Sequence, residues 1–236
     1  MDQPHGTLPD WAYPAEDDMP ESLPHLLMRT LLFELVRRYL AERGVPALTG
    51  SEQFVYWIEG NPHRSMAPDV YVLLDVEPTL PVRVVKTWEL GAPALVIEIV
   101  SDDVHKDYGT GPMRYGEMGV GELIVVDPTS GPGRHRFQCF RSDGSGDLLR
   151  VVATSADRVW SEVLGCHLRW VDDTLDGTPR VRLATGPDGD TLVPTLAEAE
   201  QAERAAKEAE QARGRALEDR IAELEALLRE KDDQGP

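Results

Sequence analysis

Apolar positions recur with a helical period near the start of the chain. From His25 to Arg43 large apolar side chains fall four or five positions apart, at Leu27, Leu31, Leu35 and Leu40, with Phe33 and Val36 beside them. Gly44 and Pro46 follow, and both are typical of the residues that come after a helix. The pattern therefore predicts one amphipathic helix that ends at Arg43.

Beyond this helix the apolar residues occur in short runs that are typical of strands. Three runs rich in β-branched and aromatic residues come first, Gln53–Glu59, Pro68–Asp75 and Ala94–Ser101, and a fourth, Glu122–Asp127, is closed by Pro128. A short helix-like piece, Met113–Met118, precedes the fourth run, and further strands follow at Arg136–Arg141, Leu148–Ala153 and Val181–Leu183. This order of elements predicts a mixed α/β or α+β domain.

Two of these strand-like runs each carry one carboxylate. Asp69 begins the run at Pro68, and Glu98 lies inside the run from Ala94. A hairpin made of the two runs brings both acids to one end of a sheet, where they repel each other unless a hard cation lies between them. Mg²⁺ and Mn²⁺ prefer oxygen ligands and keep several waters that can serve as a nucleophile. The pair therefore predicts a site for Mg²⁺ or Mn²⁺.

Each acid also has an ordinary structural explanation. Asp69 follows a proline at the start of a run, where an aspartate often does no more than begin a strand. Glu98 lies among apolar residues, where its charge is costly unless a buried partner such as Arg83 meets it. From the residues alone, both explanations stay open for each acid.

The C-terminal part differs in composition from the rest. Residues Thr195 to Lys231 are dominated by Ala, Glu, Gln, Arg and Leu and contain no proline, which predicts a separate helix over 195–233. Leu217, Ile221, Leu224 and Leu228 have the spacing of a coiled-coil seam, but two heptads are compatible with a self-associating helix and with a single solvated one. The sequence thus predicts three parts: an irregular lead-in over 1–24, a domain over 25–190 and this helix.

The formal net charge of −18 limits the kinds of molecule that the protein is suited to bind. From Glu198 onward there are 12 acidic and 7 basic residues, so most of the acidity belongs to the preceding domain. Such a domain does not suit tight, non-specific binding of nucleic acid, although a nuclease with an acidic metal site stays possible. No apolar run approaches the roughly 20 residues of a membrane helix, and the N-terminus has no signal-like stretch, so we expect a cytoplasmic protein without a membrane partner.

The two cysteines, Cys139 and Cys166, lie in apolar or mixed strand-like runs. They show no zinc-like spacing with each other or with the histidines, which predicts buried thiols rather than a metal site or a disulfide.

Four stretches taken in order resemble the Uma-type restriction endonucleases, a branch of the PD-(D/E)XK nuclease superfamily. They are MPESLPH (Met19 to His25), GNP followed by APDVYV (Gly60 to Val72), KTWELGAPALVIEIVS (Lys86 to Ser101) and YGEMGVGELIVVDP (Tyr115 to Pro128). The resemblance covers residues 10–185. It implies a restriction-endonuclease-like core, a central mixed sheet flanked by helices, with Mg²⁺ held by the motif acids.

The resemblance also implies roles for single residues. Asp69 matches the first motif acid, Glu98 matches the second, and the backbone carbonyl of Ile99 is a further oxygen ligand. Glu21 and His25 match the segment that opens the family's first helix, and Asp107 matches the family's acid after the third strand. These three residues and Arg114 are candidates for the border of the site. Simpler roles stay open for several of them, because a histidine can begin a helix and an aspartate can cap a turn.

The lysine that completes the motif is missing from both of its usual places. Val100 stands two residues after the second acid, and Gly111 stands four residues before Tyr115, where this family carries its lysine. Such a lysine positions the nucleophile and offsets the charge of the transition state. We expect Lys106 to replace it, with Arg114 and Lys86 as alternatives.

These observations lead to two hypotheses. The first is a Mg²⁺-dependent endonuclease that hydrolyses phosphodiester bonds of DNA through Asp69 and Glu98. The second is a catalytically lapsed relative, marked by Gly111, that acts as a binding or oligomerisation module. In both cases we expect a homodimer or higher homo-oligomer, and in a nuclease dimer two sites can cut two strands.

Overall fold

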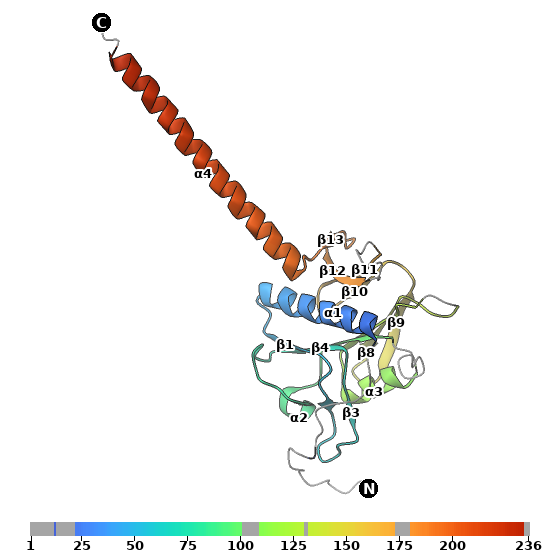
Figure 1. Cartoon of the computed structure of the whole chain (residues 1–236). Coiled ribbons are helices and arrows are strands. Elements are labelled where there is room, and N and C mark those ends of the chain that lie inside the picture. The colour runs from blue at the N-terminus through green and yellow to red at the C-terminus, as the bar shows by residue number, and fades with distance from the viewer. Residues whose placement is uncertain (1–11, 13–21, 101–108, 130–131, 173–179, 234–236) are drawn as a thin grey trace, which may run out of the picture. The chain divides into compact units, whose positions relative to one another are not determined.

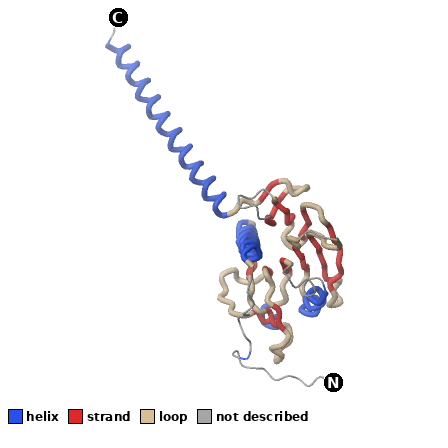
Figure 2. Tube along the Cα trace, turned by 45° about the vertical axis from the view of Figure 1, so that its right-hand side comes forward, coloured by secondary structure: helices blue, strands red, loops and turns tan. Residues whose placement is uncertain are grey.

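The computed structural model describes residues 12, 22–100, 109–129, 132–172 and 180–233. The chain divides into two compact units, Met1–Val193 and Pro194–Pro236. In the described part, the first unit holds all the strands and three helices, and the second unit is one long helix (Figures 1 and 2).

A mixed sheet of six strands forms the centre of the first unit (Figure 1). In spatial order the strands are β1 (Ala47–Gly50), β4 (Val70–Leu74), β6 (Leu95–Ile99), β7 (Glu122–Val126), β8 (Phe137–Ser142) and β9 (Leu148–Thr154). β6 and β7 run parallel, and the other neighbouring pairs are antiparallel. β7 is buried throughout, as expected for a central strand that is covered on both faces.

One face of this sheet is covered by α1 (Leu23–Glu42), which has Pro24 in its first turn. A second, antiparallel sheet covers α1 in turn; its strands are β10 (Arg158–Ser161), β11 (Cys166–Val171), β12 (Arg180–Thr185) and β13 (Thr191–Leu192). Leu32 and Val36 are fully buried in an apolar cluster that includes residues of both sheets. α1 therefore lies between two sheets, which explains why its apolar face is so broad.

The opposite face of the six-stranded sheet is covered by shorter elements. These are α2 (Thr87–Leu90), α3 (Gly111–Met118) and a small sheet of β3 (Ser65–Met66), β2 (Val55–Tyr56) and β5 (Val85–Lys86). Tyr71 of β4 and Tyr115 of α3 are buried in the apolar cluster on this side. Gly119, at a φ of 88°, ends α3 in the left-handed conformation that glycine adopts easily. This cap lets the chain turn directly into β7.

A buried polar cluster connects β7 to the end of β10. The Glu122 carboxylate is 2% exposed and accepts hydrogen bonds from Ser161 Oγ at 2.5 Å and from the Glu162 N–H at 3.0 Å. Arg141 Nε donates to it at 3.2 Å. Burial and the nearby Glu122 carboxylate raise the pKa of the Cys139 thiol to about 12. Glu122 thus has the partners that a buried charge requires.

The second unit is α4 (Leu196–Asp233), a helix of 38 residues. Thr195 and Glu198 form a capping box at its start, because the Thr195 N–H donates to Glu198 Oε2 at 2.7 Å and the Glu198 N–H donates to Thr195 Oγ1 at 3.2 Å. All residues from Glu200 to Glu225 are exposed. Among the described helices, α4 included, none is both long enough and apolar enough to pass through a bilayer.

The predicted fold class is confirmed: the protein has a central mixed sheet, flanking helices and a C-terminal helix. The strand predicted over Gln53–Glu59 is wrong in extent, since β2 holds only Val55 and Tyr56. The chain turns just before it, at Glu52 with a φ of 55°, and just after it, where the Asn61 N–H bonds back to Ile58. The elements that were not predicted are β1, β3, β5, β10, β11, β13 and α2. β1 comes directly after Pro46 and has only four residues.

Candidate active site

The two predicted acids belong to the same end of two neighbouring strands. β4 and β6 are antiparallel, and their pairing ends with Val70 opposite Ile97. Asp69 comes directly before β4, and Glu98 follows Ile97 in β6. Both acids therefore lie next to the last pair at this end of β4 and β6.

Asp69 is held by contacts to both of its carboxylate oxygens. The Ile99 N–H donates to Oδ2 at 2.7 Å, and His25 Nε2 lies 2.9 Å from Oδ1. The side chains of His25 and Asp69 are 15% and 13% exposed. The candidate site therefore draws on the start of α1 as well as on the sheet.

A second chain of contacts holds the backbone at Asp69. Ser51 Oγ donates to the Asp69 carbonyl at 2.7 Å, and Arg29 Nη1 donates to Ser51 Oγ at 2.8 Å. Arg29 also pairs with Glu52 at 3.0 Å. Arg29 is 8% exposed, so a guanidinium is buried only two hydrogen bonds away from a candidate metal ligand.

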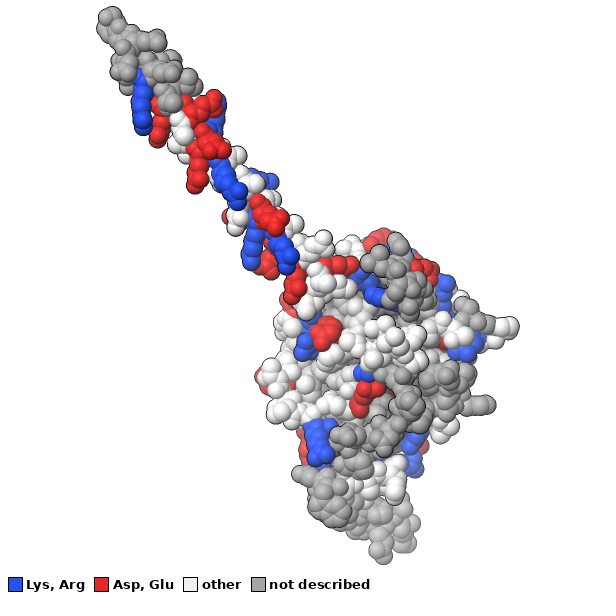
Figure 3. All heavy atoms as spheres, viewed as in Figure 1, with Lys and Arg blue, Asp and Glu red and all other residues white. Residues whose placement is uncertain are grey.

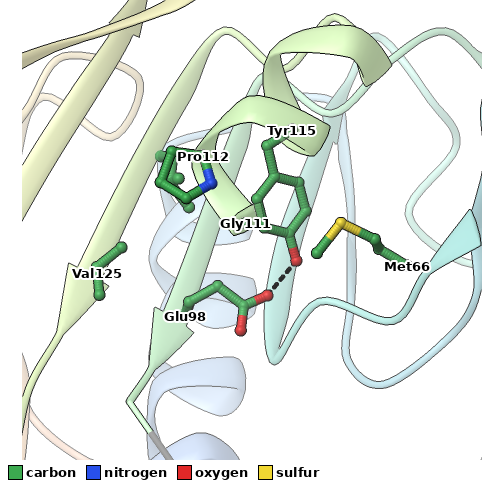
Figure 4. Close-up of a pocket in the computed structure, with 7 residues that line it drawn as sticks. Met66, Glu98, Gly111, Pro112, Tyr115 and Val125 are labelled. Atoms are coloured by element: carbon green, nitrogen blue, oxygen red, sulfur yellow. Dashed lines mark hydrogen bonds between the residues drawn. The ribbon is translucent and has the colours of Figure 1, made fainter. Parts of the chain in front are cut away.

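Glu98 is the one residue of β6 that is not fully buried. Its Oε1 accepts a hydrogen bond from the Tyr115 hydroxyl of α3, as Figure 4 shows. Tyr115 itself is 1% exposed, so its ring belongs to the core while its hydroxyl reaches the candidate site. Tyr115 therefore combines a packed ring with a polar contact to the second acid.

A narrow pocket lies beside Glu98 (Figure 4). Its wall includes Gly111 and Pro112 from the first turn of α3, together with Met66, Leu123 and Val125. The position at which the family carries its lysine is therefore next to the second acid in space. With glycine there, this position offers no ammonium to the site.

The sequence also named five other candidate residues for the site. Glu21, Lys106 and Asp107 lie outside the described residues. The guanidinium of Arg114 lies over the Trp57 ring, 5.9 Å from its centroid. Lys86 pairs with Glu89 at 3.3 Å, and its side chain is 14% exposed.

Sequence reasoning missed Arg29 and Ser51. Arg29 lies four residues after His25 on the same helix and therefore on the same face. Arg29 stands on the otherwise apolar face of α1, and this position could have indicated that it is buried. Ser51 gave no such signal, because its contact to Asp69 depends on the pairing of β1 with β4.

The number and type of ligand atoms at the candidate site determine which metal ion it suits. Among the described residues, no group of three or more His, Cys, Asp or Glu side chains is placed to hold an ion. Mg²⁺ is commonly bound through one or two carboxylates and keeps several waters, so Asp69 and Glu98 meet this smaller requirement. Structural zinc sites take four protein ligands, mostly sulfur and nitrogen. The donor set thus suits a hard divalent cation.

Fold and site together describe a mixed α/β domain with two acids at one end of the β4–β6 pair of its central sheet. The family model described as Uma2, putative restriction endonuclease, matches residues 15–173, and the chain belongs to this family. The resemblance seen in the sequence is thereby confirmed. A comparison with curated proteins gives no significant match. Among solved structures, the chain is similar to a putative nuclease of the DUF820 group from Anabaena variabilis, at 15% identity and a TM-score of 0.44, over 62% of this chain and 76% of that one.

Proposed function

We propose that the protein is a metal-dependent endonuclease that hydrolyses phosphodiester bonds of DNA. The observation that supports the proposal is that Asp69 directly precedes β4 and Glu98 lies in the neighbouring strand β6 at the same end of the pair, with Asp69 held by the Ile99 N–H and by His25. Membership of a family described as putative restriction endonucleases supports the same activity.

In this proposal Asp69 and Glu98 hold Mg²⁺ or Mn²⁺, and the Ile99 carbonyl is a further ligand. When bound, the ion would supply positive charge that lowers the pKa of a bound water and offsets the negative charge that develops on the phosphate. Tyr115 orients Glu98 through its hydroxyl, and Ser51 with Arg29 fixes the backbone at Asp69. Buried hydrogen bonds of this kind hold ligands in place before the substrate arrives.

The test is cleavage of supercoiled plasmid DNA with Mg²⁺ or Mn²⁺, compared with the same reaction in a chelator. We expect nicked and linear products from the wild-type chain and none from Asp69→Asn, which keeps the size of the side chain and removes its charge. Cleavage by Asp69→Asn at the wild-type rate would exclude Asp69 from the mechanism. If the wild-type chain is folded but releases no heat on titration with Mg²⁺ and cleaves no DNA, the proposed metal site is excluded.

One observation favours the second candidate, a relative that has lost catalysis and acts as a binding or oligomerisation module. Gly111 lies in the wall of the pocket beside Glu98, where the family's lysine is expected. Under this hypothesis the wild-type chain binds the ion without cutting, and Gly111→Lys restores cleavage. Gly109→Lys is the matched control, because Gly109 is exposed and has no neighbouring atom within 4 Å of its Cβ position.

A further inference from the structure

α4 exposes an apolar stripe. Leu217 is 64% exposed, Ile221 is 56% exposed and Leu224 is 45% exposed. They are spaced four and three residues apart and therefore lie along one side of the helix. Isolated helices are marginal in water, and most helical stability comes from packing of an amphipathic face. A helix with this stripe is therefore stabilised by a partner that covers it.

The identities on the stripe indicate how many helices come together. In heptad terms Leu217 and Leu224 occupy d positions and Ile221 occupies the a position between them. A β-branched residue at a, combined with leucine at d, favours two strands over three or four. Upstream the seam is interrupted by Gly214, so the paired region is confined to the C-terminal part of α4.

The charges beside the stripe identify the partner and its direction. Arg213 and Arg220 occupy the g positions, and Glu218 and Glu225 occupy the e positions. In a parallel, in-register pair each g residue faces the e residue five positions further along the other helix. Arg213 then meets Glu218 of the partner subunit, and Arg220 meets Glu225 of the partner subunit. All four contacts across such a dimer are attractive.

An antiparallel pair of the same helices has the opposite electrostatics. There g faces g and e faces e, so arginines oppose arginines and glutamates oppose glutamates. The charges also form pairs within one helix, such as Arg220 with Glu223 at 2.5 Å, but these pairs are present in either arrangement. Figure 3 shows that both signs of charge are presented along the described part of α4.

We infer that α4 pairs with α4 of a second copy of this chain as a parallel, in-register, two-stranded coiled coil through Leu217, Ile221 and Leu224. Because each helix is joined to its domain at Pro194, a parallel pair puts both domains at the same end of the coil. The inference rests on α4 alone and does not depend on the proposed nuclease activity.

The first test is sedimentation velocity of the full chain over a range of concentrations. We expect a concentration-dependent dimer for the wild type. Arg220→Glu replaces attraction with repulsion at two symmetry-related contacts and should raise the dissociation constant about tenfold. Arg215→Glu is the matched control: it makes the same charge change at a b position, away from the seam, and should dimerise as the wild type does.

A mixing experiment separates pairing from loss of helix. The double variants Arg213→Glu/Arg220→Glu and Glu218→Arg/Glu225→Arg should each be largely monomeric, and their equimolar mixture should dimerise. Monomeric wild type at every concentration, an equal effect of the g and b substitutions, or no recovery in the mixture would each overturn the inference.

Direction and register are tested by disulfide formation. Leu217→Cys should cross-link two chains under mild oxidation, because d positions meet each other only in a parallel, in-register pair. Asp219→Cys, at the f position, should not. The native thiols, Cys139 and Cys166, are buried and do not compete. Failure of Leu217→Cys to cross-link, or equal cross-linking by both variants, would contradict a parallel register.

None of these measurements uses metal or DNA, so their outcome is distinct from that of the cleavage assay.

Discussion

Replacing Asp69 tests whether its carboxylate is held as the structure shows. The two substitutions to compare are Asp69→Ala and Asp69→Asn, both measured in a chelator so that no metal contributes. Alanine removes the acceptor of the Ile99 N–H, and Ile99 is 1% exposed. Asparagine keeps an oxygen for that donor and can still bond to His25.

The magnitudes follow from these contacts. A buried donor left without an acceptor costs about 1–3 kcal/mol, so Asp69→Ala should lower the free energy of unfolding by that amount. Asp69→Asn should recover most of it, since it keeps the hydrogen bond and relieves repulsion with Glu98. For a chain of this size each kcal/mol corresponds to about 2–4 °C in Tm. The alanine variant should therefore melt several degrees below the asparagine variant.

Urea denaturation followed by circular dichroism, together with thermal melts, measures both variants on one scale. An alanine variant as stable as the wild type would refute the bond from Ile99 to Asp69. If both variants lose the same free energy of unfolding, the negative charge of Asp69 matters for stability and its role as acceptor for the Ile99 N–H does not. Addition of Mg²⁺ should then raise the Tm of the wild type and leave the Tm of both variants unchanged.

Three further predictions concern the rest of the domain. Gly50→Ala should destabilise the fold by about 1–3 kcal/mol or more in urea, because its Cβ would lie 2.1 Å from Cζ of the buried Tyr71 ring. Glu122→Ala should cost about 3 kcal/mol or more in the same assay, because it leaves Arg141 and the buried hydroxyl beside it without their acceptor. The pKa of Cys139 is raised from 9.0 to about 12, so above pH 9 the unfolded chain loses a proton that the folded chain keeps, and the free energy of unfolding should fall with rising pH.

Each of these predictions has its own control. Gly109→Ala adds the same methyl group at an exposed position and should change stability by less than about 0.5 kcal/mol. Glu122→Gln should lower the free energy of unfolding less than Glu122→Ala does, since glutamine keeps one acceptor oxygen. Cys139→Ala should flatten the fall in stability between pH 9 and pH 11. A pH dependence unchanged by that substitution would assign the effect to other groups.

Much of the candidate site could be predicted because its acids stand in distinctive surroundings. Glu98 interrupts an apolar run and Asp69 begins another, and the antiparallel pairing of these two runs places both acids at one end of the β4–β6 pair. His25 was one of the candidates for the border of the site, with a simple helix-start role left open, and its Nε2 lies 2.9 Å from Asp69 Oδ1. The chain of contacts through Arg29 could not be predicted, because it depends on how α1 and β1 meet at one end of the sheet.

The sequence by itself determined the periodic elements: α1, the apolar strands β4, β6 and β7, and α4. Their signals are local, since each follows from the spacing of side chains along one segment. Only the tertiary structure decided that a second sheet covers α1, that Tyr115 meets Glu98, and that Gly111 lies beside the same acid. These contacts join segments that are distant in the chain, and their geometry depends on strand register and packing, for which no single segment carries a signal.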